Sequence, residues 1–512
     1  MKVVSSAQMR ELDELTIKSR QVDGKELMLR AGVGFAEAAM LFINTFCSKH
    51  FKRVVVLAGK GNNAGDAYVS ANYFYEKFNL NIIVFAICGI DKLSGDTKYY
   101  AQRMNSSVNF AVKETLNNSD FFEGDVIIDG LLGTGFEGEE LKGLYKNWIE
   151  VVNRQNKVVI AIDVPSGLNA TNGIGTGIKA DLTITIALPK RGFFIKNGVD
   201  NTGKIKVVDI GISSEFIDKI ESDLNLYSKD LASKFLRRIP CNIHKKLKGS
   251  VLIIGGSKYY TGAPFLSGLA ALRSGAGLVT VAIPKTVKVN CNCNSLIIRR
   301  VEDANKGIFC SSSMPEIISL IEQHSSIVIG PGMASDTANI EILKTVIESG
   351  KRVVFDADAL NLIALNPNIL KKYDNFVFTP HHGEALRLAK AFGVDVGDDR
   401  ITFAKELAEV LGGTLVCKGN KTITSSYGKT SYANGSGSAA LATAGSGDVL
   451  SGIIGALISN SINDVFEPSV FAVYLHGCAG ELAEIDYGVR GTTADDIINY
   501  IPKAMKEISP FA

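Results

Sequence analysis

Short apolar runs that end in glycine and polar residues recur along the chain, and this pattern constrains the fold most strongly. The first run is RVVVLA at 53–58, followed directly by the turn sequence GKGNNAGD at 59–66. A continuous apolar run of this length fits a strand that is buried on both faces of a parallel sheet. Helical segments separate most of the runs, so strands and helices alternate. The sequence therefore predicts α/β architecture with doubly wound, mostly parallel sheets.

The chain is too long for one hydrophobic core, because it has 512 residues. A helical region at 6–44 precedes the first strand, and the strands expected in the first domain are 53–58, 81–88, 125–128, 158–162, 182–187 and 205–209. A charged stretch at 213–241 has no clear strand and is typical of a helical linker or of the first element of a new domain. The strands expected after it are 251–254, 278–283, 326–329, 352–356, 376–379, 414–417 and 421–425. We predict a Rossmann-like first domain at 1–220 and a second α/β domain at 221–512.

Composition excludes several classes of protein. The net charge of +2 provides no overall attraction to nucleic acid or to an anionic membrane. The eight cysteines form no CxxC pair, so we expect reduced thiols without a disulfide framework or a zinc site. The charged N-terminal residues do not form the apolar centre of a signal peptide, and no apolar run has the length of a membrane span. We therefore expect a cytoplasmic protein that binds neither membranes nor nucleic acid.

Polar residues follow the ends of the strands in the first domain, which is where open parallel sheets bind ligands. They are Asn62, Asn63 and Asp66 after the first strand, Asp129 and Gly133 to Phe136 after the third, Asp163 to Asn169 after the fourth, and Lys190 after the fifth. Gly133 to Gly138 also match the GxGxxG pattern of dinucleotide-binding proteins, but no strand-end acid follows at the usual interval to hold a ribose. We expect one oxygen-rich pocket and no standard redox-cofactor site.

The second domain contains a glycine turn that leads directly into an apolar helix. Gly445-Ser446-Gly447-Asp448 is followed at once by the apolar segment 449–457. The free N–H groups and the positive dipole end of a helix start form an anion site. A carboxylate beside a bound phosphate suits the acceptance of a proton from an attacking hydroxyl. The motif alone fits equally well an acidic helix start whose glycines only allow close packing.

Other strand ends of this domain supply further groups for phosphoryl transfer. They are Gly330-Pro331-Gly332, Asp356 to Asn361, Thr379 to Glu384 and Lys418 to Thr422. A lysine, a glycine-rich anion loop, an acid placed as a base and further acids able to organise Mg²⁺ together indicate phosphoryl transfer. The sequence GxxxxGK[ST] is absent from the chain, so the domain is not a P-loop fold.

These motifs resemble those of a known family. The second domain is similar to the ribokinase-like superfamily, and more narrowly to the ADP- or ATP-dependent NAD(P)H-hydrate dehydratases, through Gly249 to Gly256, Thr261 to Pro264 and the strand-end motifs above. The first domain resembles the NAD(P)H-hydrate epimerases, through Gly61 to Asp66, Asp129, Gly133 to Phe136, Asp163 to Gly167 and Pro189-Lys190. Both resemblances occur in the order found in bifunctional nicotinamide-nucleotide repair enzymes.

The resemblance implies a repair reaction. Hydrated NAD(P)H carries water added across a ring double bond, with a hydroxyl at C6 in the R or the S configuration. The first domain would interconvert the two forms. In the second domain, Asp448 would deprotonate the hydroxyl of the S form for attack on the terminal phosphoryl group of ADP or ATP, with ADP the usual donor in bifunctional members. Phosphate would then leave as the lone pair of the ring nitrogen restores NAD(P)H.

The resemblance also implies residue roles. The catalytic residues would be Asp448 in the second domain and Asp163 and Lys190 in the first. The hydrated nucleotide would contact Asn62, Asn63, Ala64, Gly65, Asp66, Gly133, Thr134, Gly135, Phe136 and Asp163, and in the second domain Ala263, Gly332, His381 and Asp448. ADP, with Mg²⁺, would be held by Lys418, Gly419, Asn420, Lys421, Thr422, Gly445, Ser446 and Gly447. Asn63, Asp129 and Ser166 would bind K⁺ through hard oxygen ligands.

Some positions depart from the family pattern, and one alternative function stays open. Ala64, Ala67 and Ala334 replace glycines, His382 replaces a frequent proline, and Ser446 replaces threonine. The alternative is a ribokinase-like kinase of a small alcohol fused to a non-catalytic binding domain, which would accumulate a phosphorylated product. In either case the partners are small molecules, and we expect a homo-oligomer because ribokinase-like dehydratases often assemble.

Overall fold

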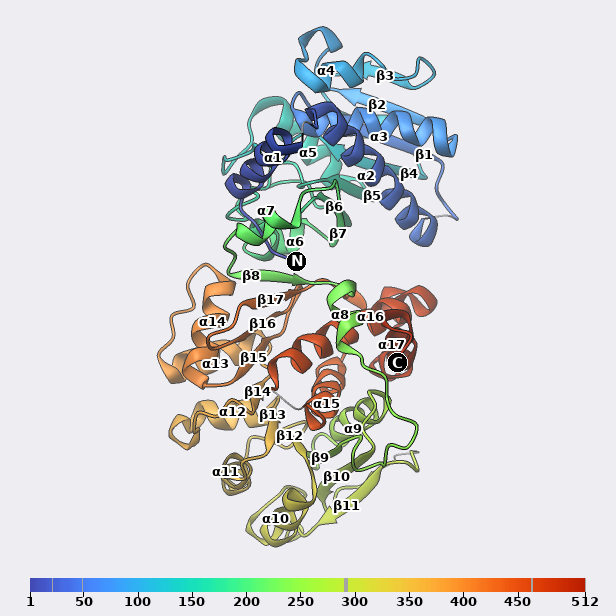
Figure 1. Cartoon of the computed structure of the whole chain (residues 1–512). Coiled ribbons are helices and arrows are strands. Elements are labelled where there is room, and N and C mark those ends of the chain that lie inside the picture. Colours follow the sequence, from blue (N-terminus) through green and yellow to red (C-terminus); the bar gives the residue numbers. More distant parts are fainter. Residues whose placement is uncertain (21, 48, 290–292, 462–463, 512) are drawn as a thin grey trace. The chain divides into compact units, whose positions relative to one another are not determined.

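The computed structural model describes the whole chain except residues 21, 48, 290–292, 462–463 and 512. The chain divides into two compact units, Met1–Asn225 and Leu226–Ala512. Each unit contains its own sheet and its own hydrophobic core (Figure 1). The division falls after residue 225, whereas the sequence predicted it after residue 220. We call the two parts unit 1 and unit 2 and describe each by itself.

Within the described residues, the sheet of unit 1 has seven strands, all parallel, in the order β3-β2-β1-β4-β5-β6-β7. The strands are β1 (Arg53–Ala58), β2 (Ile82–Ala86), β3 (Asn109–Val112), β4 (Asp125–Gly130), β5 (Val158–Ile162), β6 (Leu182–Ile186) and β7 (Lys204–Val208). The chain runs outward from β1 in one direction and from β4 in the other, so the topological switch point lies between β1 and β4. Such a switch point is where doubly wound sheets bind ligands.

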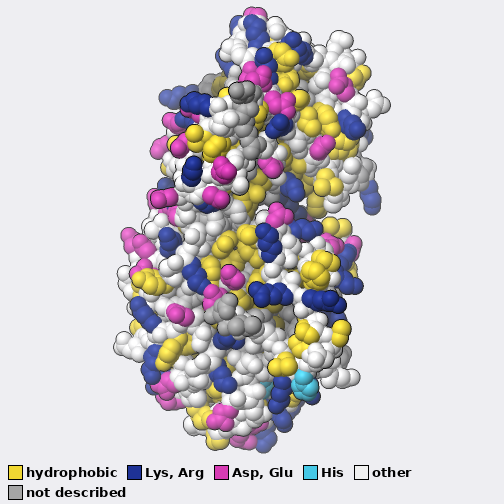
Figure 2. Space-filling model, in the orientation of Figure 1, with side chains coloured by type: hydrophobic (Ala, Val, Ile, Leu, Met, Phe, Trp, Pro, Cys, Tyr) yellow, Lys and Arg dark blue, Asp and Glu magenta, His cyan; other side chains and the backbone are white. Residues whose placement is uncertain are grey.

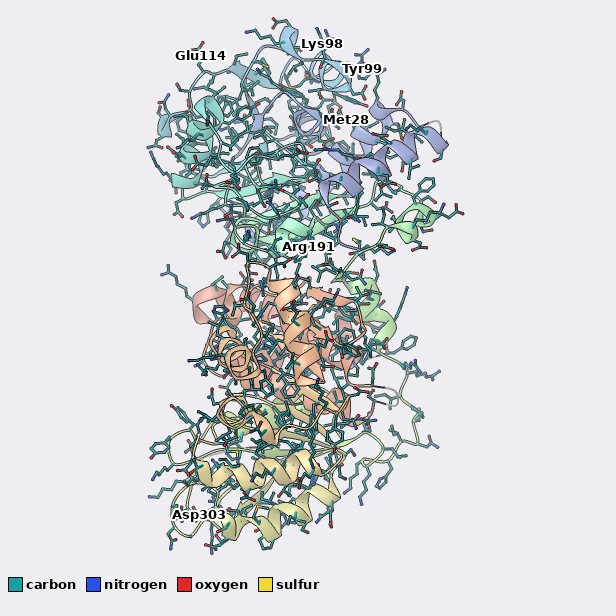
Figure 3. All side chains as sticks on the ribbon, turned by 90° about the vertical axis from the view of Figure 1, so that its left-hand side faces the viewer. Met28, Lys98, Tyr99, Glu114, Arg191 and Asp303 are labelled. Carbon is teal, nitrogen blue, oxygen red and sulfur yellow. The ribbon has the colours of Figure 1, made fainter. Side chains whose placement is uncertain are left out.

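Helices cover this sheet and supply much of its core. They are α1 (Ser6–Arg20), α2 (Gly24–Phe46), α3 (Asn62–Phe78), α4 (Gly95–Ala101), α5 (Gly143–Arg154), α6 (Gly198–Asn201) and α7 (Ser214–Lys219). Helix α2 packs against α3, and Gly65 of α3 allows this close approach, because a Cβ there would lie 2.3 Å from Sδ of Met28. Met28 is buried in the interior of unit 1 (Figure 3).

Unit 2 contains a ten-stranded sheet, counted over the described residues, in the order β11-β10-β9-β12-β13-β14-β15-β16-β17-β8. The strands are β8 (Leu224–Tyr227), β9 (Ser250–Ile254), β10 (Leu278–Pro284), β11 (Ile297–Val301), β12 (Ser326–Ile329), β13 (Arg352–Phe355), β14 (Phe376–Phe378), β15 (Thr414–Cys417), β16 (Ile423–Ser426) and β17 (Ser431–Asn434). Neighbours from β11 to β15 are parallel, and β16 is antiparallel to β15 and to β17. The switch point of this sheet lies between β9 and β12.

The helices of unit 2 are α8 (Lys229–Phe235), α9 (Ala263–Arg273), α10 (Met314–Gln323), α11 (Ile340–Glu348), α12 (Asp358–Leu365), α13 (His382–Phe392), α14 (Arg400–Leu411), α15 (Ser446–Ser459), α16 (Phe466–Gly491) and α17 (Ala494–Ile508). Helix α15 packs against α9, α16 and strands β12 and β13. The residues of α15 are buried on all sides of the helix, so α15 lies at the centre of this core.

The strand and helix predictions agree with most of the core, and the differences have physical causes. The structure confirms β1, β5, β12 and β15 at their predicted bounds. Strands β3, β11 and β17 were not predicted, because they are short and partly exposed. The prediction that 213–241 lacks a strand was wrong, since β8 lies within it. The single helical region expected at 6–44 is two helices, α1 and α2.

The expectations about cysteines and membrane spans can be compared with the structure. Every described cysteine is a free thiol, and Cys291 lies outside the described residues. Among the helices that the structure describes, none is both long enough and apolar enough to cross a bilayer. Basic and acidic side chains are interspersed over the face drawn in Figure 2, in keeping with the small net charge.

Candidate active sites

Unit 1 contains a cavity of about 710 Å³ at the end of the sheet where β1 and β4 finish. Residues from α1, α2, α3, α4 and the loops after β4, β5 and β6 form its wall. Of the residues predicted for this site, those on the wall are Asn62, Asn63, Asp66, Gly133, Thr134, Gly135, Phe136, Asp163 and Lys190. Ala64 is fully buried in the core, and Gly65 packs on α2. The cavity therefore brings together side chains that the sequence placed at four separate strand ends.

Asp163 and Lys190 form a buried ion pair in this cavity. Lys190 is fully buried, and its Nζ donates to Oδ1 of Asp163, to Oγ1 of Thr185 at 2.9 Å and to the carbonyl oxygen of Ile186 at 2.9 Å. Oδ1 of Asp163 also accepts from the backbone N–H of Ile186 at 3.0 Å. The backbone of Asp163 has φ +62°, a left-handed conformation that is uncommon outside glycine and frequent at functional sites. All of these bonds use Oδ1, and the structure gives Oδ2 no hydrogen bond among the described residues.

Asn63, Asp129 and Ser166 meet through the backbone of Leu132. Ser166 Oγ donates to Oδ1 of Asp129 at 2.5 Å and accepts from the N–H of Leu132 at 2.8 Å, and Nδ2 of Asn63 donates to the carbonyl oxygen of Leu132 at 2.8 Å. Burial raises the pKa of Asp129 to about 6, against the hydrogen bonds that it accepts from Ser166 and Leu131. Oδ1 of Asn63 is buried and has no hydrogen-bond partner among the described residues. An orphaned amide oxygen beside a buried carboxylate and a hydroxyl is a donor set suited to a hard monovalent cation.

In unit 2, the glycine turn at 445–447 opens α15 as predicted. Gly445 has φ +88°, and a Cβ there would lie 2.5 Å from Cδ1 of Leu266, so only glycine fits without strain. Ser446 Oγ lies 3.2 Å from Nε2 of the buried His476. Burial, together with the charge of Lys418, lowers the pKa of His476 to about 4, so this imidazole is neutral near pH 7. The N–H of Ser446 donates to the carbonyl oxygen of Thr443 at 3.3 Å, which fixes the turn that opens α15.

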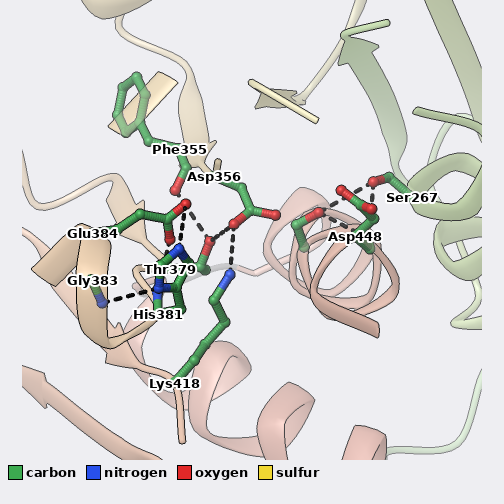
Figure 4. A network of polar contacts seen from close by, with 10 residues as sticks. Ser267, Phe355, Asp356, Thr379, His381, Gly383, Glu384, Lys418 and Asp448 are labelled. Atoms are coloured by element: carbon green, nitrogen blue, oxygen red, sulfur yellow. Dashed lines mark hydrogen bonds and ion pairs between the residues drawn. The ribbon is translucent and has the colours of Figure 1, made fainter. Parts of the chain in front are cut away.

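Lys418 lies within reach of this helix start. A Cβ on Gly447 would be 3.3 Å from its Nζ. The same Nζ donates to Oδ1 of the buried Asp356 at 2.9 Å, and that oxygen also accepts from Oγ1 of Thr379 at 2.8 Å (Figure 4). Burial alone would lower the pKa of Lys418, but the charges of Asp356 and Glu384 outweigh it and raise the pKa. A permanent positive charge therefore lies next to the anion-binding turn.

Asp448 lies beside this network, in the first turn of α15 (Figure 4). Its backbone carbonyl accepts from Oγ of Ser267 and of Ser451, both at 2.9 Å, and this fixes the turn. The structure gives its carboxyl group no hydrogen bond within the described part of the chain. The pKa of Asp448 is raised to about 7. Burial contributes most to this shift, the charge of Asp356 adds to it, and the charge of Lys418 opposes it. A carboxyl with a pKa near neutrality is suited to general-base catalysis.

The other predicted residues of unit 2 lie on loops around the same strand ends. Ala263 starts α9, and a Cβ on Gly332 would be 3.2 Å from Cβ of Ala263, so these two residues are neighbours. His381 caps α13: its N–H donates to Oε2 of Glu384 at 2.8 Å, and its Nδ1 accepts from the N–H of Gly383 at 3.0 Å. The loop Lys418, Gly419, Asn420, Lys421 and Thr422 joins β15 to β16 and is closed by Oγ1 of Thr422, which donates to the carbonyl oxygen of Gly419 at 3.0 Å.

Comparisons with known proteins agree with this geometry. A family model described as NAD(P)H-hydrate dehydratase matches residues 251–503, and one described as YjeF-related protein N-terminus matches residues 24–192. The bifunctional NAD(P)H-hydrate repair enzyme of Moorella thermoacetica is 31% identical over 99% of this chain and 97% of its own. The chain belongs to the bifunctional NAD(P)H-hydrate repair enzymes. The member from Coxiella burnetii is 33% identical over 96% of this chain and 97% of its own.

A solved structure is also similar to part of this chain. It is the ADP/ATP-dependent NAD(P)H-hydrate dehydratase of Bacillus subtilis, co-crystallized with ATP/Mg2+, with 26% identity and a TM-score of 0.47 over 55% of this chain and 98% of that chain. The full-length matches favour a repair enzyme over the alternative of a small-alcohol kinase fused to a binding domain. They leave the roles of individual residues as proposals.

Three departures from the family pattern have a simple structural basis in this repair enzyme. The methyl groups of Ala64 and Ala67 are fully buried and point into the core. Cβ of Ala67 lies 2.6 Å from where a Cβ on Gly130 would be, so the glycine at 130 makes room for it. Ala334 takes a left-handed φ of +67°, and its N–H donates to Oδ2 of Asp358 at 2.9 Å, which holds that strained turn. Nothing in the structure explains His382.

The sequence analysis missed one group in the cavity of unit 1. Asp13, on α1, lies on the cavity wall together with Asp66 and Asp163. Burial raises the pKa of Asp13 to about 6, with Lys190 opposing and Asp163 adding to the shift. Burial and the charges of Asp163 and Asp13 also raise the pKa of Asp66 well above its ordinary value. The available signal was the spacing of Met9, Asp13 and Ile17, which puts one acid on an apolar helix face.

Proposed function

We propose that this repair enzyme epimerises hydrated NADH and NADPH in unit 1 and dehydrates the S form in unit 2 with ADP as phosphoryl donor. One observation carries the dehydratase assignment. Asp448 is an unbonded carboxyl, with its pKa near neutrality, in the first turn of a helix whose N-terminal glycines lie next to a buried lysine. A base, an anion-binding helix start and a fixed cation at one place are what transfer of a phosphoryl group to a hydroxyl needs.

In the dehydratase step, the carboxylate of Asp448 takes the proton from the C6 hydroxyl as its oxygen attacks the terminal phosphorus of ADP. The N–H groups of Gly445 and Gly447 stabilise the charge on the transferring group, and the ammonium of Lys418 adds to this. AMP leaves. The lone pair of the ring nitrogen then expels phosphate from C6, because phosphate is a far better leaving group than hydroxide, and loss of the C5 proton restores the dihydronicotinamide.

The loops around Asp448 divide between the two substrates. We assign Ala263, Gly332 and His381 to the hydrated nucleotide and residues 418–422 to ADP. The neighbouring positions of Ala263 and Gly332 support the first assignment, because Ala263 starts α9, which packs against the helix that carries Asp448. Burial and the nearby charges of Lys418 and Arg387 lower the pKa of His381, so its imidazole is neutral at working pH.

Mg²⁺ fits this site as a companion of the nucleotide. Among the described residues, no group of three or more His, Cys, Asp or Glu side chains is arranged to hold a metal ion. Mg²⁺ is commonly bound through substrate phosphates and one or two carboxylates, and the charges of Asp356, Asp358 and Glu384 all act on the carboxyl group of Asp448. When bound, the ion would neutralise charge on the transferring phosphoryl group.

In unit 1, we assign the acid–base work of epimerisation to Asp163, with Lys190 holding its carboxylate in place. Asn63, Asp129 and Ser166 would hold K⁺. The orphaned Oδ1 of Asn63 and the raised pKa of Asp129 support this, since a cation would satisfy the amide oxygen and stabilise the carboxylate charge. The ion would fix the turn at Leu132 and so the loop 133–136 on the cavity wall.

The experiment that tests the function uses the purified chain with Mg²⁺, K⁺, ADP and a mixture of R and S hydrated NADH, followed at 340 nm. Full conversion of both epimers to NADH is the expected result. Conversion of the S fraction alone would overturn the epimerase assignment. No conversion with ADP or with ATP would overturn the repair function itself.

A further inference from the structure

Helix α1 forms one wall of the cavity in unit 1 through a single face. The α1 residues on the wall are Met9, Arg10, Asp13 and Ile17, a spacing that places them on one side of a helix. Among these, Asp13 is the one carboxyl group. The family model matches residues 24–192, so Asp13 lies outside the matched segment. The other acids near it on α1, Glu11 and Glu14, are exposed.

The position of α1 is tied to the segment that carries Lys190. Before the helix, the N–H of Val4 donates to the carbonyl oxygen of Pro189 at 2.9 Å, and the N–H of Arg191 donates to the carbonyl oxygen of Val4 at 2.9 Å. Leu12, next to Asp13, is fully buried in a cluster with Leu188. These contacts fix α1 against the loop of the Asp163–Lys190 pair, so the cavity-facing place of Asp13 is built into the fold.

The carboxyl groups of Asp13 and Asp163 differ in the partners that the structure gives them. Asp163 pairs with the buried ammonium of Lys190, whereas the structure gives Asp13 no hydrogen bond or ion pair among the described residues. Burial raises the pKa of Asp13 to about 6. The charged groups that share the cavity with it are Arg10, Asp66, Asp96, Glu137, Asp163 and Lys190. A cavity with one ion-paired carboxylate and one carboxyl kept neutral in weak acid has both an acceptor and a donor of protons.

The same cavity has a second feature that points to a ligand. Asn63, 8% exposed, lies on the wall with an unpartnered Oδ1. Among the described residues, the amide oxygen of Asn63 and the carboxyl group of Asp13 thus both line a cavity of about 710 Å³ without a hydrogen-bond partner. Such groups indicate that the cavity binds a polar ligand.

We propose that Asp13 is a second catalytic residue of the epimerase, the acid that protonates the C6 hydroxyl while Asp163 acts as the base. The inference rests on the proposed epimerase function. Asp13 gives its proton to the hydroxyl oxygen, the C6–O bond breaks with its electron pair on the departing water, and the lone pair of N1 forms the N1=C6 bond. A water then adds to the other face of C6 and gives a proton to Asp163, and the N1=C6 pair returns to N1.

The step balances, because one water leaves, one water adds, and one proton passes from Asp13 to Asp163. Exchange of protons with solvent restores both carboxyl groups, and the reverse reaction uses them in exchanged roles. Asp66 is the rival donor, since burial and the charges of Asp163 and Asp13 also raise the pKa of its carboxyl group. Its position in the first turns of α3, beside Asn62 and Asn63, suits it instead to hold the substrate.

The test compares Asp13→Asn with Glu11→Gln, a matched loss of charge on the exposed side of the same helix. Without ADP the S form is not consumed, so chromatography follows the conversion of R to S directly. We expect Asp13→Asn to lower kcat by about 100-fold or more, the usual contribution of a general acid, with KM within threefold of wild type. Asp13→Glu should recover part of the rate, and Glu11→Gln should match wild type.

Three readouts separate catalysis from a structural role. With ADP, turnover of the S form should be the same in all variants, which shows an intact chain. The wild-type R-to-S rate should fall as pH rises from 6 to 8, and this fall should disappear in Asp13→Asn. In ¹⁸O water with ADP, phosphate released from R substrate should carry one ¹⁸O, because the C6 oxygen leaves in the phosphate. Phosphate released from S substrate should carry the label only to the extent that S is epimerised before it is dehydrated.

Several outcomes would overturn the inference. One is a rate of R-to-S conversion by Asp13→Asn that is within threefold of the rate of Glu11→Gln. Another is loss of the pH dependence in Asp66→Asn instead of in Asp13→Asn. The third is release of unlabelled phosphate from R substrate. Failure of the wild-type chain to convert R to S at all, with S turnover intact, would instead overturn the epimerase function on which the inference rests.

Discussion

Replacing Asp448 with asparagine should stabilise unit 2 while it abolishes dehydration. Burial, then the charge of Asp356, raises the pKa of Asp448 from 3.8 to about 7 in the folded chain. This carboxyl group binds its proton more tightly in the folded chain than in the unfolded chain. The free energy of unfolding therefore falls as pH rises from about 4 to about 7, because ionisation is easier in the unfolded chain. A difference of this size corresponds to about 4 kcal/mol at pH 8. The amide side chain of the Asp448→Asn variant keeps the shape of the carboxyl group without this cost.

The assay is differential scanning calorimetry of the full chain, with the transition of unit 2 identified by its upward shift with ADP. At about 2 °C per kcal/mol for a large domain, Asp448→Asn should raise that transition by about 8 °C at pH 8 and by little at pH 4. Asp495→Asn, an exposed acid in the first turn of α17, is the control and should change stability by less than about 1 kcal/mol. Equal stability of Asp448→Asn and wild type at pH 8 would refute the reasoning.

Three further predictions follow from the geometry of the two sites. The rate of S-form dehydration at saturating ADP should rise with pH through an apparent pKa near 7, because Asp448 must be ionised to act as a base, and a rate that is highest at pH 5.5 would contradict this. Asn63→Ala should raise the K⁺ concentration for half-maximal R-to-S conversion about tenfold or more, as measured by K⁺ titration, since it removes a proposed ligand. Gly445→Ala should destabilise unit 2 by about 1–3 kcal/mol in denaturant titrations, because its Cβ would lie 2.5 Å from Cδ1 of Leu266; the control Gly350→Ala, also at positive φ but in open space, should cost less.

The sequence was informative where a residue's chemistry and its place at a strand end coincide. Asp163, Lys190, Lys418 and Asp448 all follow or begin an element with a strong apolar pattern. The meeting of the first two in unit 1, and of the last two in unit 2, therefore follows from parallel topology. Their roles and the cation set stay predictions, because topology brings groups together but does not show what they bind.

What the sequence did not reveal depends on contacts between segments far apart in the chain. Asp13 is one of several charges on a helix of weak amphipathic character, and only the pairing of Val4 beside Lys190 turns it toward the cavity. Strand β8 lies in a charged stretch, and its hydrogen-bonded neighbour β17 comes about 200 residues later. Arg191 likewise pairs with Asp223 at 3.1 Å, at the end of unit 1 opposite Lys98 (Figure 3). A local pattern carries no signal for such partners.

The two sites both lie at the ends of parallel strands, but their charged groups differ in a way that fits their reactions. In unit 2, Lys418 and the start of α15 concentrate positive potential where an anionic phosphoryl group must be held and transferred. In unit 1, the Asp163–Lys190 pair neutralises itself, and burial raises the pKa values of the other two carboxyl groups, those of Asp13 and Asp66. Carboxyl groups that hold their protons more tightly than usual are suited to exchange a proton with the neutral C6 hydroxyl. The groups of unit 1 therefore fit the transfer of a proton, and those of unit 2 fit the transfer of a phosphoryl group.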